Sequence, residues 1–214
     1  GFLQKKNTLN YLAMSFIDFC IGALTYWAFG FALMYGGSYL ASGLDRGNAF
    51  IGFSGFFLAG NSNDPSTSAI WFFQMMFAAA ASTIIAGAVA ERFKFNSHVF
   101  CSMIVCGILY PVYGHWVWGN GWLANLPFGA GLKDFAGSGV IHGMGGLIAF
   151  IGAWMVGPRF GKYNPDGTSN MIHGHNLSYI VLGTMFLLFG WFGFNTGSTM
   201  EATDLRISII ATNT

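Results

Sequence analysis

Long apolar runs restrict most strongly what this chain can fold into. Runs of about 20 or more mainly apolar residues lie at 9–36, 69–90, 98–118, 136–156 and 175–197, and a truncated one spans 204–214. A helix needs about 20 such residues to cross a bilayer. Charged residues make up only 8% of the chain, against about 25% in an ordinary soluble domain. The sequence therefore predicts an all-α polytopic membrane protein, with one transmembrane domain over 1–214 that contacts the lipid bilayer.

Basic residues fall in alternate connections between these runs. These residues are Lys5, Lys6, Arg92, Lys94, Arg159 and Lys162. The intervening connections, 37–68, 119–135 and 198–204, hold mainly acidic residues. Because basic loops stay in the cytoplasm, we expect the chain to start in the cytoplasm and the loop 119–135 to be external.

Several classes of function are disfavoured. A net charge of +1 gives no basic field for nucleic acid, and no nucleophile elbow, phosphate loop or dinucleotide motif suggests an enzyme or a cofactor. The pair His173 and His175 has no cluster of other ligands beside it, so no metal is expected. The chain lacks an initiator Met and ends inside an apolar run, so we expect a fragment of a longer protein.

One acidic and one imidazole side chain bracket a glycine-rich apolar segment, Asp134-Phe-Ala-Gly-Ser-Gly-Val-Ile-His142. Asp134 is well placed to begin and cap a helix, or to add a negative field near an external cation site. His142 would then lie roughly 12 Å further along that helix, near the middle of the bilayer. It is either a core histidine bonded to a neighbouring helix or part of a transport pathway.

Other polar and aromatic residues in the runs have two interpretations each. Asp18 is expected to make a hydrogen bond across helices, and His98 and His115 to reach water at helix ends. The aromatic residues near the external helix ends include Phe77, Trp118 and Phe194. They fit an interfacial belt and core packing, or a set of π faces that attracts a small cation at a pore mouth.

Taken together, the motifs resemble the ammonium transporters, the Amt/MEP/Rh superfamily, and most closely its Amt branch. The resemblance covers essentially the whole chain. It is carried by Lys6-Asn-Thr-Leu9, Phe73-Gln-Met-Met-Phe77, Ala88-Val-Ala-Glu-Arg92, His115-Trp-Val-Trp118, the segment Asp134–His142 and Gly190-Trp-Phe-Gly-Phe-Asn-Thr-Gly-Ser198.

The resemblance implies a role for each matching position. Phe77 and Phe194 match the stacked phenylalanines that gate the pore. Trp118 and Ser198 match the residues that recruit ammonium together with Phe77. His142 matches the first of two pore histidines, and Asp134 matches an acid that supports the site without touching the ion.

The resemblance also implies an architecture that this chain fills only in part. Family members have about eleven spans, built as two inverted five-helix repeats and a last helix. The chain is similar to the first repeat and the opening of the second, so the second pore histidine lies outside it. The family further implies a homotrimer in the plasma membrane and, for some members, a cytosolic PII-type regulator.

The expected function is transport of ammonium, as ammonia with or without a proton, through a hydrophobic pore lined by histidine. The main alternative is an ammonium sensor, a transporter-like receptor coupled to a signalling module. A truncated, inactive paralogue and an Rh-type gas channel also remain open, although the latter fits Trp118 and Ser198 less well.

Overall fold

The computed structural model describes residues 1–38, 40–41, 43–60, 64–203 and 205–214. These residues form two compact units, Leu9–Phe160 and Gly1–Thr8 with Gly161–Thr214. Asp204, the expected first residue of the truncated run, lies outside the described residues, as do residues 61–63 of the connection 37–68. Single-domain organisation stays a prediction.

The unit Leu9–Phe160 is built from helices and turns, with no strand among its described residues. Its helical elements, in chain order, are α1 (Thr8–Thr25), η2 (Tyr26–Gly30), α2 (Phe31–Tyr35), the short η3 (Phe56–Leu58), α3 (Pro65–Val89), α4 (Phe95–Ile104), η5 (Val105–Leu109), α5 (Tyr110–Val117), η6 (Ser138–Gly143) and α6 (Met144–Val156). The other unit contains η1 (Lys5–Asn7), α7 (Leu177–Gly197) and α8 (Arg206–Asn213). The expectation of an all-α fold is confirmed.

Consecutive elements join into helices long and apolar enough to cross a membrane. Five such segments occur among the described residues: Lys5–Tyr35, Pro65–Val89, Phe95–Val117, Ser138–Val156 and Leu177–Gly197. Each starts and ends within about four residues of an apolar run in the sequence.

The start of the helix α3 is fixed by its first residues. The Asp64 carboxylate accepts a hydrogen bond from the Thr67 N–H at 2.9 Å, and Pro65 occupies the first turn.

Three of the spans contain a π-helical turn, in which the backbone is wound more widely than in an α-helix. These turns are η2, η5 and η6, and each contains glycine. Such turns are rare and occur often at functional sites. The first two contact each other, and η6 carries His142.

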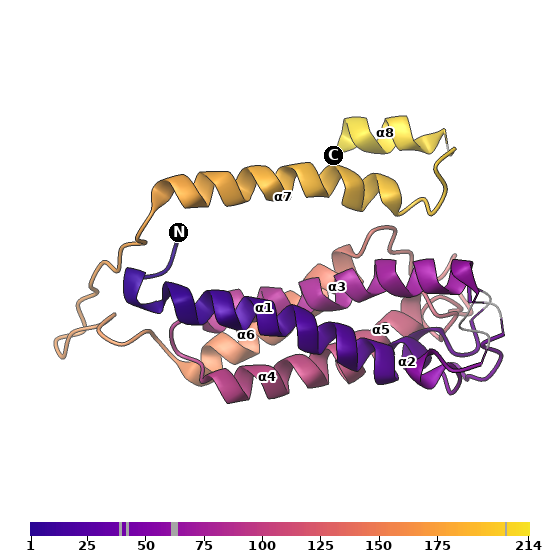
Figure 1. The fold of residues 1–214 in the computed structure, drawn as a ribbon, viewed down its shortest axis with the longest axis horizontal. Helices are drawn as coiled ribbons and strands as arrows, with labels where there is room; N and C mark the ends of the chain where they lie inside the picture. Colours follow the sequence, from indigo (N-terminus) through magenta and orange to yellow (C-terminus); the bar gives the residue numbers. More distant parts are fainter. Residues whose placement is uncertain (39, 42, 61–63, 204) are drawn as a thin grey trace. The chain divides into compact units, whose positions relative to one another are not determined.

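Small residues let these helices approach closely. A methyl group added to Gly30 would lie 2.6 Å from the backbone oxygen of Cys106, and one added to Gly107 would lie 2.5 Å from Cγ2 of Thr25. Around this crossing the core is aromatic, with Tyr26 and Tyr110 fully buried and their rings 6.1 Å apart. Figure 1 shows α1 and α3 to α6 running alongside one another as a bundle, and α3 packs against α6.

The connections at each end of this bundle are tied to one another. At one end, Arg159 forms an ion pair with Glu91 at 3.0 Å, and Arg92 donates to the Gly157 carbonyl oxygen at 2.7 Å. At the other end, the Trp116 indole donates to the Phe50 carbonyl oxygen at 2.9 Å. The basic connections at 90–94 and 157–160 therefore meet at one end of the bundle, as the charge pattern requires.

Candidate functional site

Asp134 organises the N-terminal end of the span that carries His142. One carboxylate oxygen accepts the N–H groups of Gly137 and Ser138 at 2.8 and 3.0 Å. The other accepts those of Gly139 and Val140, both at 2.8 Å. These donors are the unpaired N–H groups at the start of a helix, where a carboxylate also meets the positive end of the helix dipole. Asp134 thus caps the helix by satisfying four backbone donors at once.

The helix starts later than the position of Asp134 suggested. Its first residue is Ser138, and the preceding Gly137 has a left-handed backbone with φ of 100°, which glycine adopts without strain. His142 therefore lies only about 6 Å along the helix from its first residue, and the expectation of roughly 12 Å was wrong. The reason is that the Asp134 side chain reaches forward over a non-helical turn to cap a helix that it does not itself begin.

His142 lies on the π-helical turn η6 beside two fully buried residues. Val140 and Ile141 have no exposed surface, and His142 is half-buried. The Nδ1 atom of His142 lies 3.3 Å from the carbonyl oxygen of Gly137. A carbonyl oxygen only accepts, so this contact is a hydrogen bond when Nδ1 carries the proton. The His142 imidazole therefore lies in the apolar segment whose first turn is capped by Asp134.

Trp118 is joined to the same structure through the backbone of Asp134. Its indole Nε1 donates a hydrogen bond to the Asp134 carbonyl oxygen at 2.6 Å. Trp118 is the C-cap residue that follows α5, so this bond fixes its ring against the segment that leads into η6. Asp134 thus positions two of the predicted site residues, Trp118 through its carbonyl oxygen and His142 through its carboxylate.

Phe77 lies on α3 and is buried. Its ring meets that of Phe73, one turn earlier, edge to face, with the centroids 4.6 Å apart and an angle of 76° between the rings. Such a pair is a favourable aromatic packing arrangement. It holds the Phe77 ring in a defined orientation.

Phe194 and Ser198 belong to the other unit, where they lie one turn apart at the end of α7. The Phe194 ring stacks on Trp191 with centroids 5.2 Å apart and an angle of 9° between the rings. The Ser198 hydroxyl donates to the Phe194 carbonyl oxygen at 2.8 Å. This bond uses the single hydroxyl proton, so the oxygen keeps acceptor capacity for another donor.

Two histidines differ from expectation because they do not reach water. His98 and His115 are each only 1% exposed. The His115 ring lies between two backbone carbonyl oxygens, with Nδ1 2.7 Å from that of Met34 and Nε2 2.8 Å from that of Asn48. It thereby joins α5 to the connection 37–68, a role that its position near a helix end did not reveal.

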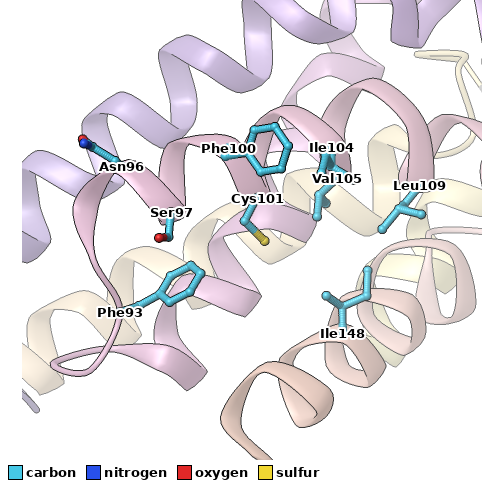
Figure 2. A pocket seen from close by; sticks show the side chains of 9 residues that line it. All are labelled: Phe93, Asn96, Ser97, Phe100, Cys101, Ile104, Val105, Leu109 and Ile148. Atoms are coloured by element: carbon cyan, nitrogen blue, oxygen red, sulfur yellow. The ribbon is translucent and has the colours of Figure 1, made fainter. Parts of the chain in front are cut away.

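His175 has a structural partner. Its Nδ1 atom lies 3.0 Å from the Leu3 carbonyl oxygen, and no cluster of three potential metal ligands occurs in the described part of the chain. An open, mainly apolar groove follows α4 (Figure 2), and none of the predicted site residues lines it. The unit Leu9–Phe160 holds four of the predicted site residues: Asp134 connects Trp118 with the helix of His142, and Phe77 lies on α3. Their role as one site stays a prediction.

Comparison with known proteins places the chain in a family. The sequence model of the Ammonium Transporter Family matches residues 1–214. The ammonium transporter Amt2 of Archaeoglobus fulgidus is 48% identical over all of this chain and 45% of its own length. The ammonium transporter 1 member 3 of Solanum lycopersicum is 40% identical over 92% of this chain and 42% of its own length.

Solved structures agree with this assignment. The structure of a protein named "Sensor Amt Protein" has a TM-score of 0.86 and 40% identity, covering 99% of this chain and 51% of its own. Mep2 of Candida albicans has a TM-score of 0.74 and 30% identity, covering 90% of this chain and 41% of its own. The chain thus spans about half the length of the relatives that it matches. It is a multi-pass membrane protein that belongs to the ammonium transporter family, a family of transporters and not of enzymes.

Proposed function

We propose that the protein containing this chain is an ammonium transmembrane transporter or channel. It recruits ammonium at an external aromatic site and passes ammonia, with or without a proton, along a hydrophobic pore that contains His142. Membership of the ammonium transporter family supports the substrate. The observation that carries the assignment of residues is the double role of Asp134, which fixes both the Trp118 ring and the helix that bears His142.

The recruiting site in this proposal consists of Phe77, Trp118 and Ser198. The faces of aromatic rings attract a small cation, and a hydroxyl oxygen accepts a hydrogen bond from it. Trp118 suits this role because its indole N–H is already bonded to the protein, which holds the ring in place. Ser198 suits it because its proton is donated to the Phe194 carbonyl oxygen, which leaves lone pairs for the hydrogens of ammonium.

Below this site we assign the gate to Phe77 and Phe194, and the first pore histidine to His142. Ammonium and potassium are nearly the same size, so a pore cannot separate them by radius. A dry apolar path penalises any ion strongly and favours a species that can give up its proton. Ammonium can do so and potassium cannot, which makes a histidine-lined apolar pore selective. The second pore histidine belongs to the other half of the fold.

The wider setting follows from the same proposal. We place the protein in the plasma membrane as a homotrimer, with the start of this chain in the cytoplasm and the loop 119–135 outside. A cytosolic PII-type protein is a candidate regulator at the cytoplasmic face. Support for the orientation comes from the meeting of the basic connections at one end of the bundle.

Ammonium sensing is the second candidate, and one observation favours it. The solved structure that shares 40% identity with this chain belongs to a protein named as a sensor. A sensor would keep the recruiting residues and lose flux, with a signalling domain after its last span. A short tail there would favour transport.

The test is electrical and uses the full-length protein in liposomes. Ammonium pulses should produce a saturable transient current, and potassium pulses should produce none. His142→Ala should lower the ammonium current at least tenfold or abolish selectivity, while His173→Ala, an exposed loop histidine, should leave both unchanged. Unaltered current and selectivity in His142→Ala would refute the pore assignment. Ammonium binding without current would favour sensing or neutral gas conduction, which a pH-sensitive dye inside the liposomes separates.

A further inference from the structure

A second polar site lies between α1, α3 and α4. Asp18 on α1 is fully buried. Its Oδ1 atom accepts hydrogen bonds from Ser82 on α3, at 2.6 Å, and from Ser102 on α4. Thr83 donates to the other carboxylate oxygen at 3.2 Å. The expected hydrogen bond of Asp18 across helices is confirmed, and it joins three helices.

The site lies well inside the membrane span. Ser82 precedes the end of α3, at Val89, by seven residues, and Ser102 follows the start of α4, at Phe95, by seven. At 1.5 Å per residue, both serines lie roughly 10 Å from the helix ends at the basic connection 90–94. An ionised group at this depth is costly unless a partner balances its charge.

His98 faces the carboxylate of Asp18. Its side chain is 1% exposed, and Nε2 lies 3.5 Å from Oδ1 of Asp18, within ion-pair distance. Neither ring nitrogen makes a hydrogen bond within the described part of the chain. The ring of Phe93 meets the His98 ring nearly edge on, with centroids 6.4 Å apart. Phe93 also forms part of the wall of the groove along α4 (Figure 2).

Counting protons decides the charge of this pair. The count takes the carboxylate and the neutral imidazole as the state with no added proton, and in that state a negative carboxylate would stand alone in an apolar interior. With one proton added to each group, the carboxylic acid would be neutral and a positive imidazolium would stand alone. A single proton gives zero net charge, either as carboxylate and imidazolium or as carboxylic acid and neutral imidazole, and only this count avoids a lone buried charge.

Three neighbouring titratable groups supply no counter-charge. Tyr11 on α1, Cys101 on α4 and Cys106 on η5 also interact with Asp18 electrostatically. Phenols and thiols are neutral when protonated and carry no positive charge. Among the described residues, His98 is therefore the side chain that can carry a positive charge beside Asp18.

We propose that Asp18 and His98 form a proton-binding site that holds one proton at neutral pH, in a cage completed by the hydroxyls of Ser82 and Ser102. The ligand is a single proton, shared between carboxylate and imidazole. The site is distinct from His142, which lies on η6. It does not depend on whether the protein transports or senses ammonium.

The experiment measures both members of the pair in the full-length protein, reconstituted in lipid at neutral pH. Infrared difference spectra between the wild type and Asp18→Asn report whether the Asp18 carboxyl group is protonated. Solid-state NMR of ¹⁵N-histidine, assigned with His98→Gln, reports whether His98 is neutral or an imidazolium. Both substitutions keep side-chain size nearly constant, and Ser102→Ala is a control that removes a donor without changing charge.

The expected wild-type result is one proton, seen as carboxylic acid with neutral imidazole or as carboxylate with imidazolium. In His98→Gln, Asp18 should become a carboxylic acid, and in Asp18→Asn, His98 should be neutral. Ser102→Ala should keep the count at one. A carboxylate with a neutral imidazole in the wild type, or protons on both groups, would overturn the proposal. So would an Asp18 carboxylate in His98→Gln. If Asp18→Asn does not fold, selective ¹³C labelling of aspartate in the wild type and His98→Gln gives the same count.

Discussion

At the scale of single residues, Asp134 shows how one side chain can serve a site without entering it. Its carboxylate bonds four successive backbone N–H groups, and its carbonyl oxygen holds the Trp118 indole. The sequence predicted a cap at this position because an acid stands before an apolar run. It could not predict the reach over Gly137, because that depends on a left-handed turn and not on residue type alone.

Replacing Asp134 should weaken this end of the helix. In Asp134→Asn, an amide NH₂ faces two of the backbone donors, and the charge that balanced the helix dipole is lost. Hydrogen bonds to charged groups contribute about 1.5–3 kcal/mol each, so we expect the stability to fall by about 3 kcal/mol. The thermal unfolding midpoint of the full-length protein in detergent measures this loss.

The matched control for this substitution is Asp45→Asn, the same chemical change at an exposed loop residue, which should leave the midpoint unchanged. Equal midpoints for the two variants would show that the cap contributes little. Loss of ammonium current in Asp134→Asn at a temperature where the protein remains folded would further support positioning of Trp118 and His142.

At the scale of helices, hydropathy was enough to place the spans but not to describe their interior. Length and apolar content predict a helix that crosses the bilayer, and helix ends follow from caps such as Asp64. The turns η2, η5 and η6 depend on how neighbouring helices fit together, and no local sequence signal marks them. Burial of His98 and His115 was missed for the same reason, since the groups that enclose them come from distant parts of the chain.

Close packing between η2 and η5 gives a prediction at this scale. Gly30→Ala would place a methyl group 2.6 Å from the Cys106 carbonyl oxygen, and backbone cannot move aside as a flexible side chain can. Overpacking of this kind costs typically 1–3 kcal/mol, so we expect a loss of about 2 kcal/mol. Gly87→Ala on α3 is the control, because its methyl group would meet only the Tyr11 hydroxyl, at 3.8 Å.

Gly87→Ala should be neutral or raise stability by about 0.5–1 kcal/mol, since alanine favours the helix. Thermal unfolding of the two variants, measured side by side in the same detergent, distinguishes the cases. A Gly30→Ala protein as stable as Gly87→Ala would mean that the two helices can separate without cost, contrary to the close approach of η2 and η5.

At the scale of the whole molecule, the chain holds about half of the fold of its relatives. The predicted site residues are correspondingly divided, with Phe77, Trp118, Asp134 and His142 in one unit and Phe194 and Ser198 in the other. Sequence could assign them to one site only through the resemblance to a family, because no spacing rule relates residues so far apart in a membrane bundle. The direction in which the chain crosses the membrane, however, can be predicted from its charges alone.

The charge pattern predicts a definite orientation that chemical labelling can test. Ala130 and Ser169 are exposed residues of the connections 119–135 and 157–174, which the alternation places on opposite sides of the membrane. In intact cells that express the full-length protein, a membrane-impermeant maleimide should label Ala130→Cys. It should label Ser169→Cys only after the cells are made permeable. The full-length protein without either substitution gives the background, and the three cysteines of this chain lie within the spans. Labelling of Ser169→Cys alone in intact cells would mean that the orientation is inverted, and the aromatic end of the bundle would then face the cytoplasm and could not recruit external ammonium.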